Sequence, residues 1–125
     1  MDGYVAKYHN RPIKRYCQAL DLREQPELIA EYRRLHSKEC MQKEILDGIR
    51  QVGILEMEIY IHGNHLFMII ETSLEFRWDE AMAKLAALPG QAEWEDRVAL
   101  YQKVMTGSTS AEKWQKMERI FYLYE

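Results

Sequence analysis

The 125-residue sequence predicts an α+β protein: a ferredoxin-like, four-stranded antiparallel sheet with helices on one face. Three observations support this class. Segments with strand and helix periodicity follow one another in the order strand, helix, strand, strand, helices, strand. The two central strands are joined by a two-residue turn. Apolar residues make up 47% of the chain and charged residues 30%, which is typical of a globular protein.

Four segments predict the strands. Residues 14–22 alternate between two sides with one interruption, and residues 54–61 alternate cleanly between apolar and polar side chains. Gly63-Asn64 is a tight-turn sequence, and residues 66–70 return as a strand that is apolar on both faces. Residues 113–123 alternate again. We therefore expect a hairpin in the middle of the chain and a final strand near its end.

The helices follow from apolar spacing and end signals. Pro26 suits the first turn of a helix, and the apolar stripe that follows is interrupted once before it ends at Gly53, which predicts one broken helix or two in succession. Thr72 to Glu75 has the spacing of a capping box and predicts the start of a further helix, closed by Pro89-Gly90. A last helix is predicted from Gln91 to Met105.

Composition restricts the function. Residues 1–13 are polar and aperiodic and predict a flexible leader, whereas residues 14–125 form a single predicted domain. A net charge of −3 without a basic stripe argues against nucleic-acid binding. We expect no membrane partner and a cytoplasmic location, because the sequence shows neither a signal peptide nor a membrane span. Cys17 and Cys40 are far apart and show no metal-type spacing, which fits free thiols in a reducing compartment.

The strand at residues 66–70 also predicts a partner. Helices cover one face of the sheet, so the apolar side chains on the other face would remain an exposed patch in a single chain. The sheet of a second subunit would cover them. We therefore expect a homodimer.

The helix after Pro26 carries the main candidate site. Tyr32 and His36 are four residues apart and point the same way, beside the apolar residue Leu35. A phenol and an imidazole directed together at an apolar surface could bind a small polar molecule and move one of its protons. The structural alternative is a core tyrosine with a histidine at a helix end.

Other candidates are weaker. His62 and His65 flank a tight turn without acidic or thiol partners at ligand spacing, so we expect no metal site. Glu56 and Glu58 share one strand face and could form an acid and base pair, although such a face is commonly just solvated. The sequence has no phosphate loop or dinucleotide fingerprint, and we expect no cofactor.

From about Lys14 to Leu123 the sequence resembles the L-rhamnose mutarotase family. The segments that carry the resemblance are Tyr32-Arg33-Arg34-Leu35-His36, Ile59-Tyr60, Leu66-Phe67, Phe76-Arg77-Trp78, Trp94 and Ile120-Phe121-Tyr122-Leu123. The resemblance implies a dimeric α+β barrel that interconverts the α and β anomers of a 6-deoxy-hexose. Such an enzyme is an isomerase and uses neither metal nor cofactor.

The same resemblance assigns roles to single residues. It makes His36 the catalytic residue, Tyr32 a sugar-binding residue and Trp94 one member of a sugar-binding tryptophan pair. Two positions depart from the family: Met57 stands where rhamnose enzymes usually carry a second sugar-binding tyrosine, and Glu93 replaces the other tryptophan. We expect both to contact substrate. A tyrosine exchanged for methionine can change a preference among hydroxyl epimers, which makes L-fucose a rival to L-rhamnose.

Two other functions remain open at this point. The same barrel is used by cofactor-free oxygenases that act on aromatic substrates and by non-catalytic sugar or effector sensors. Oxygen uptake with a quinol substrate would identify the first. Ligand binding without faster anomer exchange would identify the second.

Overall fold

The computed structural model describes residues 1–104 and 108–124. In chain order its elements are β1 (Ile13–Asp21), α1 (Pro26–Leu35), α2 (Lys43–Gln51), β2 (Ile54–His62), β3 (His65–Ser73), α3 (Trp78–Ala87), α4 (Gln91–Ala99), α5 (Ser110–Lys113) and β4 (Gln115–Lys116). The interrupted stripe after Pro26 thus forms two helices. Within the described residues, no helix has the length and apolar character needed to cross a membrane.

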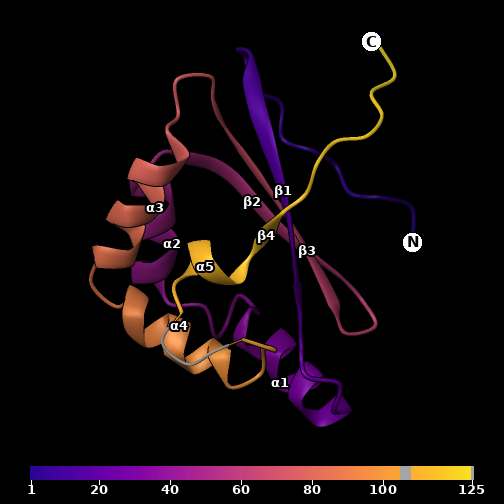
Figure 1. Ribbon diagram of the computed structural model, residues 1–125, viewed down its shortest axis with the longest axis vertical. Helices are drawn as coiled ribbons and strands as arrows, with labels where there is room; N and C mark the ends of the chain where they lie inside the picture. The colour runs from indigo at the N-terminus through magenta and orange to yellow at the C-terminus, as the bar shows by residue number, and fades with distance from the viewer. Residues whose placement is uncertain (105–107, 125) are drawn as a thin grey trace.

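The strands form one antiparallel sheet in the order β2-β3-β1-β4. This is the strand order of the ferredoxin-like fold. Figure 1 shows the helices gathered on one side of the sheet, whereas both ends of the chain extend on the other. The predicted fold class is therefore confirmed for the single chain.

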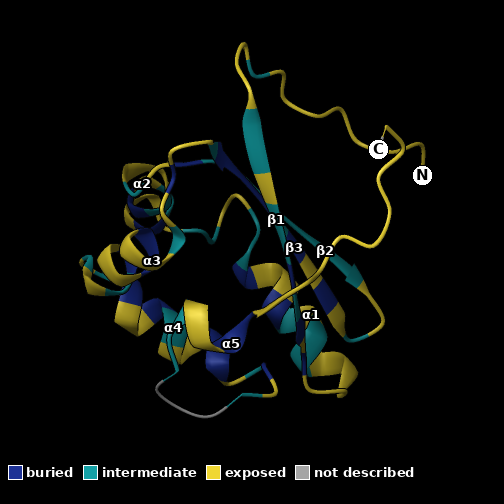
Figure 2. Ribbon diagram, turned by 45° about the horizontal axis from the view of Figure 1, so that its top comes forward, coloured by how far each residue is buried: buried dark blue, intermediate teal, exposed yellow. Residues whose placement is uncertain are grey.

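The core lies between the sheet and the helices. In β1, Gln18 and Leu20 are buried because they face the helices, while Arg15 faces the opposite side and is exposed. Five large apolar side chains are at most 2% exposed: Leu22, Leu35, Ile45, Leu66 and Ile70. Burial of each contributes about 1.5–3 kcal/mol relative to exposure. Figure 2 shows this buried layer between the sheet and the helices.

The central hairpin is confirmed. Gly63 has a φ of 62°, which glycine adopts without steric cost and which a tight hairpin turn requires. Asn64 ties the turn to the end of β1, because the Leu22 N–H donates to the Asn64 carbonyl at 2.8 Å and the Asn64 amide donates to the Leu22 carbonyl at 2.9 Å.

The predicted capping box at Thr72 is wrong. Thr72 remains in β3, fully buried and paired with Lys14 and Ile54, so α3 begins only at Trp78. A strand position inside the sheet thus overrides the local cap signal. The structure places a capping box at Thr109 instead, where it starts α5. The last long helix ends at Ala99, and the predicted helical position Met105 lies outside the described residues.

The predicted last strand is also mostly absent. Only Gln115–Lys116 pairs, with β1, followed by one hydrogen bond from the Met117 N–H to the Cys17 carbonyl at 2.8 Å. Residues 118–124 are exposed and contain no strand. An alternating segment needs a neighbouring strand and a covered face to become a strand, and a single chain supplies neither here.

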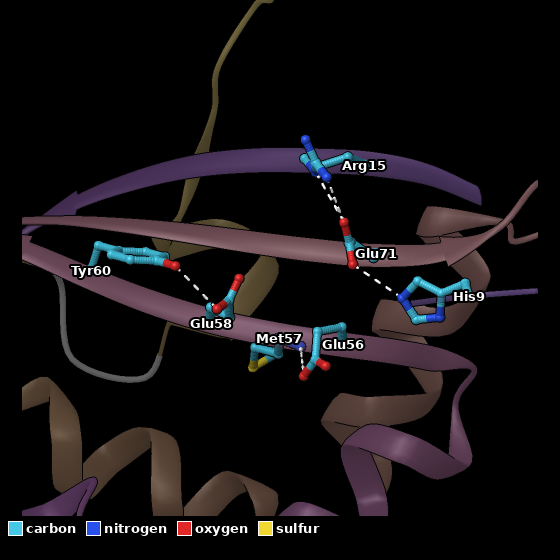
Figure 3. Close-up of polar contacts among 7 residues, drawn as sticks. All are labelled: His9, Arg15, Glu56, Met57, Glu58, Tyr60 and Glu71. Atoms are coloured by element: carbon cyan, nitrogen blue, oxygen red, sulfur yellow. Dashed lines mark hydrogen bonds and ion pairs between the residues drawn. The ribbon is translucent and has the colours of Figure 1, made fainter. Parts of the chain in front are cut away.

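The leader contacts the helix-free face of the sheet. His9 Nε2 lies 3.1 Å from Glu71 Oε1, and Arg15 donates to Glu71 Oε2 at 2.7 Å (Figure 3). Tyr4 packs edge-on against Tyr60, with ring centroids 5.8 Å apart. Burial works to raise the pKa of Glu71, but the hydrogen bonds from Arg15 and His9 outweigh it and lower that pKa. The predicted flexibility of this segment stays a prediction.

Candidate active site

Helix α1 brings Tyr32 and His36 together. Pro26 occupies the first turn, and Leu35 is 1% exposed, which fixes the inward side of the helix. Tyr32 lies on that inward side and His36 caps the C-terminal end, with ring centroids 4.3 Å apart. The predicted i, i+4 pair therefore converges.

The backbone fixes the His36 ring. Its Nδ1 lies 2.8 Å from the Tyr32 carbonyl oxygen, which can only accept a hydrogen bond. In the neutral ring, Nδ1 thus carries the proton and Nε2 keeps its lone pair. Burial lowers the pKa of His36, and the hydrogen bond to the carbonyl opposes this shift without cancelling it. At neutral pH the ring is a neutral base.

Tyr32 is a buried phenol, 4% exposed. Burial raises its pKa, so it stays protonated. Gln102 Nε2 donates to the Tyr32 hydroxyl oxygen at 3.5 Å, which leaves the hydroxyl proton free for another acceptor. Gln102 is itself 2% exposed, and its Oε1 has no hydrogen-bond partner among the described residues. A buried polar atom without a partner costs about 1–3 kcal/mol.

Trp94 completes an aromatic group. Gly90, with a φ of 82°, makes the left-handed turn that starts α4 and places Trp94 one turn later. The Trp94 ring lies edge-on to the His36 ring, with centroids 5.2 Å apart, and is 9% exposed. The His36 ring thus lies against both the Tyr32 ring and the Trp94 ring.

These rings line an inner cavity between the sheet and the helices. Its volume is about 70 Å³, which at roughly 10–15 Å³ per water holds about five waters. This is room for one small ring-shaped molecule. The apolar lining includes Met41, Ile49, Met57, Ile59, Met68 and Val98, and the polar lining includes Gln91, Glu95, Gln102 and Ser110.

The cavity adjoins an outer cleft of about 650 Å³. Tyr32, His36 and Ile59 line both spaces. The outer cleft is further lined by Tyr4 of the leader and Glu58 of β2. The pair Tyr32 and His36 therefore stands where a molecule from solvent would reach the inner space.

Glu95, which lines the inner cavity, belongs to a buried ion pair with Lys113 behind the cavity wall. Lys113 Nζ donates to Glu95 Oε1 at 2.9 Å and to the Glu95 carbonyl at 2.8 Å, and the side chain of Lys113 is 0% exposed. Gln91 Nε2 donates to the other carboxylate oxygen of Glu95 at 2.7 Å. Glu95 and Gln91 also line a second cavity of about 80 Å³ among α3, α4 and α5.

Of the remaining predicted site residues, some line the inner cavity and others do not. Met57 lines the inner cavity. Glu93 is exposed on the outer side of α4 and lines no part of that cavity, so the structure does not bring it to the other site residues. Glu58 accepts a hydrogen bond from the Tyr60 hydroxyl at 3.0 Å, and Glu56 accepts one from the Met57 N–H at 3.3 Å, as Figure 3 shows. Neither carboxylate lines the inner cavity.

The sequence analysis did not single out Glu95 and Gln102, two polar residues that line the inner cavity. The signal for Glu95 was the spacing of Gln91, Trp94 and Val98, which places Glu95 on the same helix face. Among the described residues, no group of three or more His, Cys, Asp or Glu side chains is placed to hold a metal ion.

Fold and cavity together define the class: a small ferredoxin-like α+β protein with a ring-sized pocket built around a neutral imidazole. The family model for L-rhamnose mutarotase matches residues 15–123. The chain belongs to the L-rhamnose mutarotase family, and as such it is an isomerase that interconverts anomers.

Individual proteins agree with this assignment. The chain is 34% identical over 113 residues to an L-fucose mutarotase of Xanthomonas campestris, which covers 90% of each protein. It is 32% identical over 114 residues to a UPF0734 protein of Dictyostelium discoideum, covering 88% of this chain and 90% of that one. The crystal structure of an L-rhamnose mutarotase from Formosa agariphila shares the fold, with a TM-score of 0.65 at 20% identity over 88% of this chain and 98% of that one.

Proposed function

We propose that this chain interconverts the α and β anomers of a 6-deoxy-hexose, with His36 as the acid and base. The observation that carries the proposal is the bond between His36 Nδ1 and the Tyr32 carbonyl at 2.8 Å. It leaves Nε2 as the free base of a ring that lines both the inner cavity and its outer cleft.

The reaction needs one group that both takes and returns a proton. Nε2 removes the proton of the anomeric hydroxyl, the electron pair of that bond forms the C1=O1 double bond, and the bond from C1 to the ring oxygen O5 breaks with its pair going to O5. The imidazolium then returns the proton to O5. Rotation about C1–C2 followed by the reverse steps gives the other anomer, and the enzyme ends unchanged.

The other side chains orient the sugar. The Tyr32 hydroxyl has a free proton to donate to a sugar oxygen, and Trp94 offers an apolar surface for the C–H face of a pyranose. Met57 and Met68 from the sheet line the same cavity. An apolar lining favours the methyl group of a 6-deoxy sugar over a hydroxymethyl group, because burying an unpaired hydroxyl is costly.

The same cavity supports a 6-deoxy-hexose as the substrate class, and the relatives suggest which sugar to try first. The relative at 34% identity is an L-fucose mutarotase, and Met57 stands where rhamnose enzymes usually carry a tyrosine. We therefore expect L-fucose to be turned over, with L-rhamnose as the comparison sugar.

Saturation-transfer NMR of the anomeric protons tests the proposal. Wild-type protein should exchange the anomers faster than buffer, and His36→Ala should lose about 10²- to 10⁴-fold of the catalysed rate. His62→Ala is the matched control, because His62 is exposed at the end of β2. Near-native exchange by folded His36→Ala would refute the role of His36. Sugar binding by calorimetry with exchange at the buffer rate in wild type would refute catalysis.

We further infer that the chain is a homodimer that uses the helix-free face of the sheet. Phe67 on that face is 37% exposed. The C-terminal segment leaves the fold beside the same face and exposes Ile120 by 94%, Phe121 by 75% and Leu123 by 69% (Figure 2). Contiguous apolar exposure of this kind marks an interaction surface. A second copy supplies both an apolar face and an alternating segment to pair with.

Light scattering after size-exclusion chromatography tests the dimer. The full chain should have the mass of two subunits at micromolar concentration, and Ile120→Glu/Phe121→Glu should shift it to one. Leu100→Glu is the control, since Leu100 is 65% exposed at the end of α4, among the helices. A monomer mass for the wild type would contradict the inference.

A further inference from the structure

The polar groups on the helix side of the inner cavity are hydrogen-bond acceptors with spare capacity. Each oxygen of the Glu95 carboxylate takes one hydrogen bond, from Lys113 and from Gln91, and a carboxylate oxygen can accept two. Gln102 Oε1 is buried and accepts none from the described residues. Two side chains that line one cavity thus offer four open acceptor positions, two on the Glu95 carboxylate and two on Gln102 Oε1.

These acceptors face an apolar surface. Glu95 belongs to α4 and Gln102 follows it, whereas Met57 and Met68 project into the cavity from the sheet. A molecule held here would have hydroxyl groups on one side and carbon on the other. A 6-deoxy-hexose has this division, with several hydroxyls on the ring and a methyl group at C5.

We propose that Glu95 and Gln102 bind the ring hydroxyls of the sugar and decide which hydroxyl epimer the cavity accepts. This inference rests on the proposed function and names residues that neither sequence pattern nor family resemblance singled out. L-Fucose and L-rhamnose differ in the direction of the hydroxyls at C2 and C4, so one of the two sugars leaves an acceptor in the wall without a donor. An unpaired buried acceptor lowers affinity strongly, which is how a polar site discriminates.

Lys113 makes this arrangement rigid. Its side chain is 0% exposed and holds the carboxylate through Oε1 and the backbone carbonyl of the same residue, Glu95. Gln91 fixes the second oxygen. The carboxylate therefore cannot turn to follow a misplaced hydroxyl. Glu95 positions substrate in this scheme, while proton transfer remains with His36.

Gln102 is held by its backbone and by one long side-chain hydrogen bond. Its backbone forms an isolated bridge with Leu22, and its side-chain amide donates to Tyr32. Its Oε1 therefore stays open to a hydroxyl donor of a ligand.

Glu95→Gln tests the carboxylate, with Glu80→Gln as the control, because Glu80 is exposed on α3 and lines neither cavity. Anomer-exchange rates are measured over a concentration series of L-fucose and of L-rhamnose. Glu95→Gln should raise KM about tenfold or more, since hydrogen bonds to a charged group are the stronger kind. The kcat should change by less than about threefold, and the ratio of kcat/KM for the two sugars should shift. Glu80→Gln should match wild type.

Gln102→Leu tests the amide by the same criteria and replaces Glu95→Gln if that variant does not fold. If the variants keep the wild-type KM and sugar ratio while the urea midpoint falls, both residues are structural and the inference is wrong. Wild-type protein gives an independent readout: adding L-fucose should shift the NMR signals of the Gln102 side-chain amide, and no shift would overturn the inference. If wild type leaves both sugars at the buffer rate, the proposed function fails instead.

Discussion

The Lys113 ion pair allows a quantitative test of the packing around the cavity. Methionine at position 113 keeps the apolar stem and removes the ammonium group, so the carboxylate and the carbonyl of Glu95 each lose a donor. Removing one partner of a buried pair costs about 3–5 kcal/mol. Glu95 keeps its hydrogen bond from Gln91 and its side chain is 12% exposed. We therefore expect the loss in unfolding free energy to lie at the lower end of this range, about 3 kcal/mol.

Urea unfolding at a fixed protein concentration measures this loss. The free energy of unfolding decreases by about 1–3 kcal/mol for each molar of urea, so a loss of about 3 kcal/mol in stability lowers the urea midpoint by roughly 1–3 M. Lys84→Met is the control, because Lys84 is exposed on α3 and its replacement should change stability by no more than about 0.5 kcal/mol.

A double variant separates the ion pair from simple loss of packing. In Lys113→Met/Glu95→Gln the buried charge that lost its partner is gone, so part of the stability should return. The two changes should therefore be non-additive, with a coupling of at least about 1 kcal/mol. If Lys113→Met unfolds at the same urea concentration as Lys84→Met, or if the two losses simply add, the pair does not stabilise the fold as argued.

Three further predictions follow from single positions. Burial lowers the pKa of His36, so the anomer-exchange rate should fall off on the acid side below pH 6.5, and a fall at or above pH 6.5 contradicts this. For the same reason the free energy of unfolding should decrease as the pH is lowered through the pKa of His36 in the folded protein. Gly63→Ala should cost about 1–2 kcal/mol in urea unfolding because its φ is 62°. Leu35→Ala should cost about 2–5 kcal/mol in the same assay, and Leu100→Ala, at an exposed position, less than about 0.5.

Local patterns in the sequence were enough to predict most of the fold. The hairpin around Gly63 and the helix from Pro26 are specified by neighbouring residues, and both formed as predicted. The errors lie where distant residues decide. Thr72 is held by strand pairing on both sides, and residues 113–123 alternate without a neighbouring strand over most of their length.

Sequence spacing predicted only the part of the candidate site that a single helix forms. Tyr32 and His36 share a helix, so their spacing was sufficient. Glu93 was chosen by its place beside Trp94 in the family, but two residues along a helix turn the side chain by about 200° relative to Glu95. Gln102 lies after α4, where long-range bonds to β1 and Leu22 set its position, and no local pattern indicates it.

The ion pair also leads to a test of whether the charge of Glu95 acts on the His36 ring, since both residues line the inner cavity. A lone carboxylate beside an imidazole favours the protonated ring and would raise the pKa of His36. Lys113 donates to Glu95 Oε1 at 2.9 Å and so offsets that charge, while burial lowers the pKa of His36 and keeps Nε2 a base. In Lys113→Met, NMR titration should therefore show a higher pKa for His36 than in wild type, and the acid limb of the rate profile should move up with it. An unchanged His36 titration in the folded variant would mean that the charges of Glu95 and His36 do not interact, and that the cavity needs no such compensation.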